Sequence, residues 1–242
     1  MDFTTVDLQI GIATHDQNGL DLSAVYVVIP ALNEAKRIGR VISSLHSCGF
    51  EHIVVVDDGS SDETATLSES MGTHVITHIT NMGPGASTMT GITLALQLGA
   101  EYVATIDADH QSDPRDLLTL MVGIVQNEVD LLIGSRFLQQ NTMPRRRIFY
   151  NLIGNLVSYV KTGLLVSDSQ SGLKVMTRSF AERLNIDQNG FEFCIDIIKK
   201  ARLGGAIVAE MPVGVTYTKE TLAKGQSFRQ GLMMLGRLLN PF

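Results

Sequence analysis

Two aspartates, Asp107 and Asp109, directly follow an apolar run and are separated only by Ala108. When the backbone turns, this spacing lets the two carboxylates converge, as a hard divalent cation that bridges a diphosphate requires. Gln111 could add a neutral oxygen ligand. The alternative is an acidic loop that only caps the following helix, because Asp113 stands before a proline at an expected helix start. The other polar clusters of the chain decide between the two.

A second acidic turn runs from Asp57 through Asp58 to Asp62 after another apolar run. A carboxylate at the end of a strand can accept hydrogen bonds from ribose hydroxyls or from a base N–H, so Asp57 and Asp58 are candidate nucleoside ligands. Gly59 permits a tight reversal, and Asp62 or Ser61 can cap the next helix, so part of the motif is an ordinary strand-to-helix turn. No G-x-G-x-x-G follows the first strand, which argues against a dinucleotide fingerprint.

Residues 81–86 form a glycine-rich segment before a helix that starts with small residues. Gly83 and Gly85 let the backbone approach a ligand, and N–H groups at the helix start can meet an anion. The lysine and hydroxyl residue of a P-loop are missing, so this signal is weak when it stands alone.

These motifs lie between short apolar runs and helical patterns that alternate from residue 24 onward. The expected strands are 25–29, 52–56, 74–79, 102–106 and 130–133, and the expected helices are 33–48, 64–71, 86–98 and 114–127. The alternation predicts an α/β fold with a single doubly wound, mostly parallel sheet flanked by helices. Ligands of such sheets bind outside the carboxyl ends of the strands. Asn33, Glu34 and the clusters above all follow expected strand ends, which favours one shared site and the metal interpretation of the acid pair.

Composition limits the classes of protein and partner. The chain has 242 residues, 44% of them hydrophobic, which suits one well-buried domain. A net charge of −6 argues against a nucleic-acid partner. Cys48 and Cys194 are too few and too far apart for a disulfide framework or a Cys-based zinc site, and they indicate a reducing, cytoplasmic compartment. Residues 1–23 are expected to form an extension that lacks the pattern of a secretory signal.

Two segments carry apolar residues at helical spacing beside arginines, and neither has the roughly 18–20 uninterrupted apolar residues of a membrane span. The first begins at Arg145, Arg146 and Arg147 and continues to Lys161; the second is 227–242. Both suit interfacial helices attracted to anionic headgroups. Alternatively, each covers the domain core or forms a homodimer contact. The expectation is therefore peripheral contact with a membrane.

Five motifs, in order and with suitable gaps, resemble a known enzyme family. Residues 28–34 (VIPALNE), 55–62 (VVDDGSSD) and 106–114 (IDADHQSDP) resemble family 2 glycosyltransferases of the GT-A fold. Residues 134–137 (GSRF) and 168–174 (DSQSGLK) make the chain similar to the dolichyl- and polyprenyl-phosphate sugar synthases. The resemblance runs from about residue 24 to 215 and predicts a GT-A domain over 24–226 with an amphipathic C-terminal segment.

The resemblance implies an inverting transfer of a hexose, such as mannose or glucose, from a GDP- or UDP-sugar to a polyprenyl phosphate at the cytoplasmic face of a membrane, with Mg²⁺ or Mn²⁺. The implied nucleotide-sugar ligands are Pro30, Ala31, Glu34, Asp57, Asp58, Gly85, Asp107, Ala108, Asp109 and Lys224. The implied metal ligands are Asp107, Asp109 and Gln111. The acceptor residues are Arg136, Asp168, Ser171 and Glu192, to which Arg147 of the basic cluster is added, and the catalytic residues are Asp109 and Arg136. A phosphate acceptor is already anionic, so positioning and charge neutralisation could replace a general base.

Two of these assignments have structural alternatives. Arg136 follows an expected strand and a glycine, which favours a functional role over a surface salt bridge. Glu192 lies in the segment 190–193, which resembles a Gly-Phe-x-Phe sequence beside the acceptor site of the family. Packing in the core explains the aromatic residues of this segment equally well, although a glutamate is unusual in a core.

Two segments depart from the family pattern. The family often has Gly-Lys-Gly where this chain has Gly83-Pro84-Gly85, which removes one cation near the donor. Near its end the family has an arginine followed by Gly-x-Ser-Lys in a loop over the diphosphate; here Lys224 or Arg229 could supply that charge. Two other functions therefore stay open: a soluble glycosyltransferase with a small phosphorylated or sugar acceptor, and a catalytically silent protein that binds nucleotide-sugars.

Overall fold

The computed structural model describes residues 20–138, 145–190 and 192–215, and for residues 145–147 and 150 it describes the backbone alone. In chain order the elements are β1 (Val25–Ala31), α1 (Ile38–Ser47), β2 (His52–Asp57), α2 (Thr64–Ser70), β3 (His74–Thr77), α3 (Pro84–Gln97), β4 (Tyr102–Thr105), α4 (Pro114–Asn127), β5 (Leu131–Ser135), α5 (Arg145–Thr162), β6 (Lys174–Thr177), α6 (Arg178–Arg183), α7 (Phe193–Leu203) and β7 (Val208–Pro212). The predictions for 1–19, Lys224 and 227–242 lie outside the described residues.

The strands form one mixed sheet in the order β3-β2-β1-β4-β6-β5-β7. All neighbouring strands are parallel except at β6, which runs antiparallel to both β4 and β5. The predicted mostly parallel sheet is therefore confirmed, while the reversed strand β6 was not predicted. The chain order changes direction between β1 and β4, because β2 and β3 lie on the other side of β1. Ligands of doubly wound sheets bind at such a switch point.

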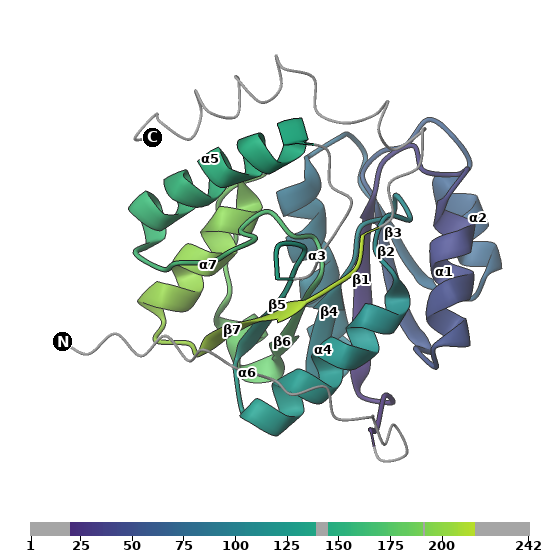
Figure 1. The fold of residues 1–242 in the computed structure, drawn as a ribbon. Helices are drawn as coiled ribbons and strands as arrows, with labels where there is room; N and C mark the ends of the chain where they lie inside the picture. Colours follow the sequence, from purple (N-terminus) through teal and green to yellow (C-terminus); the bar gives the residue numbers. More distant parts are fainter. Residues whose placement is uncertain (1–19, 139–144, 191, 216–242) are drawn as a thin grey trace.

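Helices cover both faces of the sheet (Figure 1). One face carries α1, α2 and α4, and the other carries α3, α6 and α7. α5 packs against α7 and forms an outer layer there. Central strands must therefore be apolar on both faces: in β1, Val25 and Val27 belong to one core, and Tyr26 and Val28 to the other. This is why the first strands are continuously apolar in sequence instead of alternating.

The polar segments meet at one edge of the sheet. The carboxyl ends of the parallel strands lie at this edge, and because β6 runs the other way, the loop that precedes it lies there as well. Thr105 Oγ1 of β4 donates a hydrogen bond to the Gly172 carbonyl at 2.8 Å, which holds this loop against the end of β4. Residues 168–173 therefore lie beside the acid pair, although they are some 60 residues away in sequence.

The start of α1 differs from the prediction. The sequence predicts a helix capped by Asn33, but α1 begins at Ile38. Asn33 instead has a left-handed backbone (φ 53°), and its Oδ1 accepts hydrogen bonds from the N–H and hydroxyl of Ser61. It thereby ties the β1–α1 loop to the acidic turn after β2. Asp113 is the N-cap of α4, as predicted, and accepts a hydrogen bond from Arg115 N at 3.0 Å.

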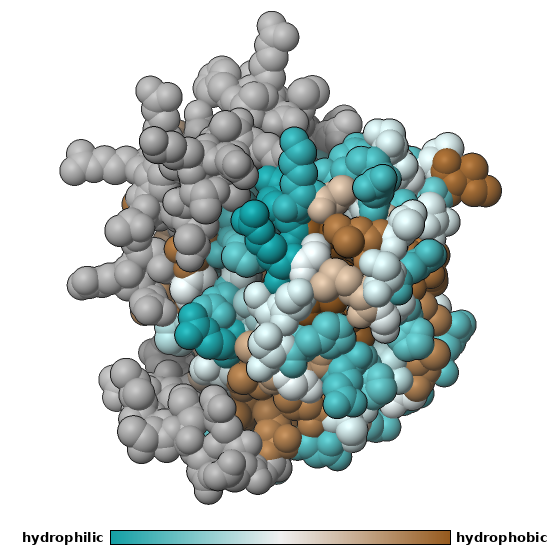
Figure 2. Space-filling view, turned by 90° about the vertical axis from the view of Figure 1, so that its right-hand side faces the viewer, coloured by the Kyte–Doolittle hydropathy of each residue, from teal (hydrophilic) through white to brown (hydrophobic). Residues whose placement is uncertain are grey.

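The surface of the molecule is uneven in hydropathy. On the side that carries α1 and α2, hydrophilic residues alternate with smaller hydrophobic areas (Figure 2).

The helix predicted over 145–161 is α5. Four apolar side chains on its outer face are 59–76% exposed and are called the apolar stripe of α5: Phe149, Leu152, Leu156 and Val160. Among the described residues, no helix is long and apolar enough to cross a bilayer.

Candidate active site

The acid pair follows β4, beside the switch point of the sheet. Asp107 is exposed to solvent, but the protein packed around it and the neighbouring Asp109 raise its pKa to about 6. Asp109 accepts hydrogen bonds from the Gln111 backbone N–H at 3.0 Å and from the Gln111 side-chain amide. In the part of the chain that the structure describes, no group of three or more His, Cys, Asp or Glu side chains surrounds a metal position. The donor chemistry still fits a hard divalent cation, since two carboxylates that disfavour each other's charge lie beside the side-chain amide of Gln111, which could turn its oxygen toward a metal.

Lys174, which sequence reasoning did not select, supplies a positive charge beside this pair. It begins β6, pairs in register with Thr105 and is 1% exposed. Its ammonium donates a hydrogen bond to the Ser171 carbonyl and lies 3.6 Å from Cys194 Sγ. Its charge and that of Arg136 act against the upward shift of the Asp107 pKa. A lysine inside an apolar run was a usable signal, because lysine is buried only where it has a partner.

Gly172 brings the loop before β6 into contact with the acid pair. A Cβ atom at this position would lie 2.2 Å from Asp107 Oδ2, well inside contact distance. Only glycine therefore allows the loop to approach the carboxylate this closely, and the acid pair has the loop as one wall.

Asp57 offers an unsatisfied oxygen at the end of β2. The residue is 2% exposed, and its Oδ2 accepts a hydrogen bond from Ser60 N at 3.3 Å. Its Oδ1 is buried and has no hydrogen-bond partner among the described residues. A buried carboxylate oxygen without a donor is costly, and a ribose hydroxyl or a base N–H would satisfy it. This favours the predicted role of Asp57 as a nucleoside ligand.

Asp58, by contrast, holds the neighbouring loop. Its two oxygens accept hydrogen bonds from Met82 N at 2.9 Å and Gly83 N at 2.8 Å, and His78 Nδ1 lies 2.8 Å from Oδ1. Burial alone would raise the pKa of Asp58, but the hydrogen bonds from His78 and the two N–H groups hold it below its ordinary value. The residue is 3% exposed, so its oxygens serve the 82–83 segment, and direct contact with a nucleoside stays a prediction.

The close backbone approach predicted for the glycine-rich segment is present, but the approaching group belongs to the chain itself. A Cβ atom at Gly85 would lie 1.9 Å from the Gln188 carbonyl oxygen, and one at Gly83 would lie 2.3 Å from that of Asn189. The N–H of Gly85 donates to the Asn189 carbonyl at 2.9 Å. The 188–189 segment therefore explains both glycines, and a contact of Gly85 with the donor stays a prediction.

The predicted donor residues of β1 lie beside the acidic turn. Pro30 and Ala31 end the strand, and the Ala31 carbonyl accepts a hydrogen bond from Asp58 N at 2.8 Å. Glu34 forms an ion pair with Arg37 at 2.6 Å. The Glu34 charge also adds to the upward shift of the Asp107 pKa, so it lies within electrostatic reach of the acid pair. The structure thus gathers these residues at one edge of the sheet.

Arg136 lies just after β5 and is held by Asp168. The guanidinium donates from Nε to Asp168 Oδ2 at 2.6 Å and from Nη2 to Oδ1 at 2.7 Å, and the Arg136 backbone N–H donates to Oδ2 at 3.0 Å. The Asp168 side chain is 1% exposed, whereas that of Arg136 is 22% exposed. The predicted alternative of a surface salt bridge therefore does not describe this pair. A bidentate pair with one partner fully buried fixes the direction of a cation.

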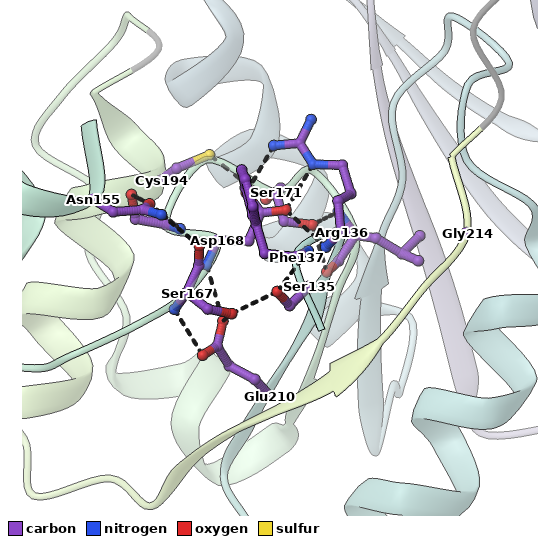
Figure 3. Close-up of polar contacts among 12 residues, drawn as sticks. Ser135, Arg136, Phe137, Asn155, Ser167, Asp168, Ser171, Cys194, Glu210 and Gly214 are labelled. Atoms are coloured by element: carbon purple, nitrogen blue, oxygen red, sulfur yellow. Dashed lines mark hydrogen bonds and ion pairs between the residues drawn. The ribbon is translucent and has the colours of Figure 1, made fainter. Parts of the chain in front are cut away.

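The loop that carries Asp168 is anchored from two elements (Figure 3). Glu210 of β7 accepts hydrogen bonds from Ser167 N at 2.8 Å, from Ser167 Oγ at 2.9 Å and from Asp168 N at 3.1 Å. Burial raises the pKa of Glu210. Asn155 of α5 bonds the backbone of Ser167 and Ser169. Sequence reasoning missed both anchors, because each is a single polar residue in an unremarkable segment.

For the other predicted acceptor residues, the structure gives a position but no contact among the described residues that points to an acceptor. The Ser171 hydroxyl is buried and bonds within its own loop, with Leu173 N at 3.2 Å. Glu192 is 9% exposed at the start of α7. The backbone of Arg147 lies in the first turn of α5, and its side chain lies outside what the structure describes. The acceptor roles of these residues stay predictions.

The acid pair at the switch point of the sheet agrees with what the comparison with protein families shows. Residues 26–184 match the family model "Glycosyl transferase family 2", so the chain belongs to this family and is a glycosyltransferase. Its fold is the GT-A fold. It resembles the solved glucosyl-3-phosphoglycerate synthase from Mycobacterium tuberculosis in complex with Mn²⁺, UDP and glucosyl-3-phosphoglycerate, with a TM-score of 0.65 and 20% identity over 90% of this chain and 81% of that one.

Two relatives in sequence carry names for lipid-linked sugar transfer. One is a UDP-N-acetylglucosamine–dolichyl-phosphate N-acetylglucosaminyltransferase from Methanococcus voltae, 29% identical over 89% of this chain and 94% of the relative. The other is a polyprenol monophosphomannose synthase from Mycolicibacterium smegmatis, 29% identical over 85% of this chain and 83% of the relative. The two names share a polyprenyl-type phosphate and differ in the sugar.

Proposed function

We propose that this glycosyltransferase moves a sugar from a nucleoside-diphosphate sugar to the phosphate of a polyprenyl lipid, with inversion at the anomeric carbon. The observation that carries the proposal is the placement of Arg136. Its guanidinium is fixed by buried Asp168 at the edge that also holds Asp107 and Asp109, and its charge acts on Asp107. A fixed cation beside an acid pair suits an anionic acceptor that meets a diphosphate donor.

On the donor side, Asp57 receives the nucleoside through its unsatisfied Oδ1. Asp107, Asp109 and the Gln111 amide would hold Mg²⁺ or Mn²⁺, which neutralises charge on the leaving diphosphate when bound. The structural neighbour in complex with Mn²⁺ and UDP supports a divalent metal. The charge of Lys174 acts against the upward shift of the Asp107 pKa and so limits the repulsion between the two carboxylates.

On the acceptor side, an oxygen of the lipid phosphate forms the new bond to the anomeric carbon while the bond from that carbon to the donor diphosphate breaks. The attacking oxygen is already anionic, so no side chain has to remove a proton. Arg136 holds the phosphate in line, opposite the leaving group, which gives inversion. The work of this chain is therefore orientation and charge compensation.

The apolar stripe of α5 supports contact with a lipid surface. Phe149, Leu152, Leu156 and Val160 are exposed by 59%, 64%, 61% and 76%. Exposed apolar side chains on one helix face, after three arginines at its start, are typical of an interfacial helix. We therefore place the reaction at a membrane surface, on its cytoplasmic face. The helix reaches this surface without spanning it.

A transfer assay tests the function. Purified enzyme with Mn²⁺ and a panel of GDP- and UDP-sugars is incubated with vesicles that contain a short polyprenyl phosphate, and the lipid-linked sugar is detected by mass spectrometry. The matched control lipid is the polyprenol without phosphate. Product from the phosphate only is expected; transfer to phosphoglycerate or a free sugar instead would establish the soluble alternative. Donor binding without release of nucleoside diphosphate would establish the silent one.

Sedimentation with anionic vesicles tests the membrane contact separately. Leu152→Glu combined with Leu156→Glu is expected to leave most of the protein in the supernatant, because two charges replace apolar contact. Leu203→Glu, at the end of α7, is the matched control, since Leu203 is 74% exposed yet lies outside the stripe. Equal sedimentation of both variants would refute the assignment of the stripe.

A further inference from the structure

Asn155, on the inner side of α5, bonds both sequence neighbours of Asp168 (Figure 3). Its Oδ1 accepts hydrogen bonds from Ser169 N at 3.0 Å and from Ser169 Oγ at 2.8 Å. Its Nδ2 donates a hydrogen bond to the Ser167 carbonyl. One side chain of α5 therefore fixes the backbone on either side of the carboxylate that orients Arg136.

The contact between α5 and this loop is close and shielded. A Cβ atom at Gly154 would lie 1.9 Å from Gln170 Nε2, so a glycine lets the helix approach the loop. Ser169 and Asp168 are both fully buried. Loss of the Asn155 side chain would leave a buried hydroxyl and a buried N–H unpaired, which costs more than the loss of an exposed hydrogen bond.

Glu210 fixes the same loop from β7, through Ser167 and Asp168. Asn155 complements it, because it holds Ser169, on the other side of Asp168. Together the two anchors hold the backbone on both sides of the carboxylate that pairs with Arg136. Removal of the α5 anchor leaves the Ser169 side of the loop without this constraint.

We propose that Asn155 is the positioning residue that connects the lipid-facing helix to the acceptor arginine. It holds the loop around Asp168 and thereby sets the direction in which Arg136 presents its guanidinium to the acceptor phosphate. The inference rests on the proposed function, since it needs Arg136 to receive that phosphate. The apolar stripe of α5 and Asn155 belong to one helix, so the surface that meets lipid and the residue that orients the arginine move as one body.

If Asn155 has this role, its substitution should impair use of the acceptor and leave binding of the donor nearly unchanged. In the Asn155→Ala variant, kcat/KM for polyprenyl phosphate should fall by about 10–100-fold, because small displacements of a positioning group cost this much in rate. The dissociation constant of the donor with Mn²⁺, measured by calorimetry, should stay within about twofold, since Asp57 and the acid pair are not bonded to this loop anchor. A merely structural role would weaken both substrates together.

Two further variants complete the series. Asn155→Asp keeps the oxygen that accepts from Ser169 and should recover part of the acceptor kcat/KM. Asn127→Ala is the matched control: Asn127 ends α4 and bonds the Gly123 carbonyl of its own helix, so both substrates should behave as in the wild type. If Asn155→Ala does not fold, Ser169→Ala removes one of the same hydrogen bonds with a smaller change and carries the test.

A readout that does not depend on transfer separates this inference from the proposed function. The ¹⁵N signal of Arg136 Nε, assigned by its loss in Arg136→Lys, reports the ion pair with Asp168. It should move in Asn155→Ala and stay in place in Asn127→Ala. An unmoved signal, or equal losses for donor and acceptor, would overturn the role of Asn155. Absence of transfer to polyprenyl phosphate in the wild type would overturn the proposed function, while the signal would still decide whether Asn155 positions Arg136.

Discussion

The donor side and the acceptor side of the site are built in different ways. On the donor side, Asp57 ends β2, and Asp107 and Asp109 follow β4 within a few residues. A short sequence motif at a strand end is therefore enough to place each of these residues. On the acceptor side, Arg136 depends on Asp168, 32 residues later, and Asp168 depends on Glu210, a further 42 residues along. The donor side is thus determined by strand ends, and the acceptor side by tertiary contacts. Substitutions far from the site should therefore affect acceptor use more than donor use.

The largest effect is expected on the donor side. Asp109→Ala should abolish metal-dependent donor binding and lower turnover by roughly a thousandfold or more, because the charge on the leaving diphosphate loses its clamp. Calorimetry with nucleoside diphosphate and Mn²⁺ measures the loss, and thermal unfolding should show the fold preserved. Asp21→Ala is the matched control, since Asp21 is exposed before β1, at the opposite edge of the sheet. Unchanged activity of Asp109→Ala would refute the metal assignment.

The next largest effect concerns the acceptor side. Arg136→Ala should lower kcat/KM for the acceptor by about 100-fold while the donor still binds. It should also destabilise the fold by on the order of 3 kcal/mol, because the buried Asp168 carboxylate loses the guanidinium that pairs with it. The double variant Arg136→Ala, Asp168→Asn should recover much of the stability and none of the acceptor use. Chemical denaturation and acceptor kinetics measure the two effects. A stable single variant would mean that the buried Asp168 carboxylate does not need the guanidinium.

The same difference explains what the sequence could and could not predict. The mostly parallel sheet followed from apolar runs that alternate with helical patterns, and the acid pair followed from its place at a strand end. The direction of β6 could not be predicted, because Lys174–Thr177 is too short to show which neighbour it pairs with. Glu210 was missed for a related reason, because it acts through contacts with residues distant in sequence, which a single sequence does not show. Lys174 was different, since a lysine inside an apolar run was a signal that could have been used.

A smaller effect is expected where the two sides touch. In Gly172→Ala, the added Cβ would lie 2.2 Å from Asp107 Oδ2, so either the carboxylate or the acceptor loop must shift. Donor affinity with Mn²⁺ should fall by about tenfold, and acceptor kcat/KM by a similar factor. Gly205→Ala tests whether glycine loss alone is responsible, since no atom lies within 4 Å of its ideal Cβ, although its positive φ adds strain of its own. A loss confined to one substrate in Gly172→Ala would show that the two sides are less coupled than this contact indicates.

The smallest expected effect is on the pH dependence of stability, and it comes from a contact between α4 and the segment after β7. Asp116, in the first turn of α4, accepts a hydrogen bond from Gly214 N, beyond the end of β7, at 2.9 Å. Burial raises its pKa from 3.8 to about 6. Because the folded state then binds the proton more tightly than the unfolded state, Asp116 makes the fold less stable as pH rises from about 4 to 6, and adds no further change above that range. In Asp116→Asn this part of the pH dependence should disappear.

The measurement is Tm between pH 4 and 7 for the wild type and for Asp116→Asn. The decrease across pH 4–6 should shrink by on the order of 2 °C, since a change of about 1 kcal/mol moves Tm by about 2–4 °C in a chain of this size and partial exposure screens the charge. Asp130→Asn is the control, because Asp130 likewise accepts a hydrogen bond from a backbone N–H near β7, that of Ile207 at 2.9 Å. If the Tm curves of the wild type and Asp116→Asn run parallel, protonation of Asp116 does not contribute to the pH dependence of stability.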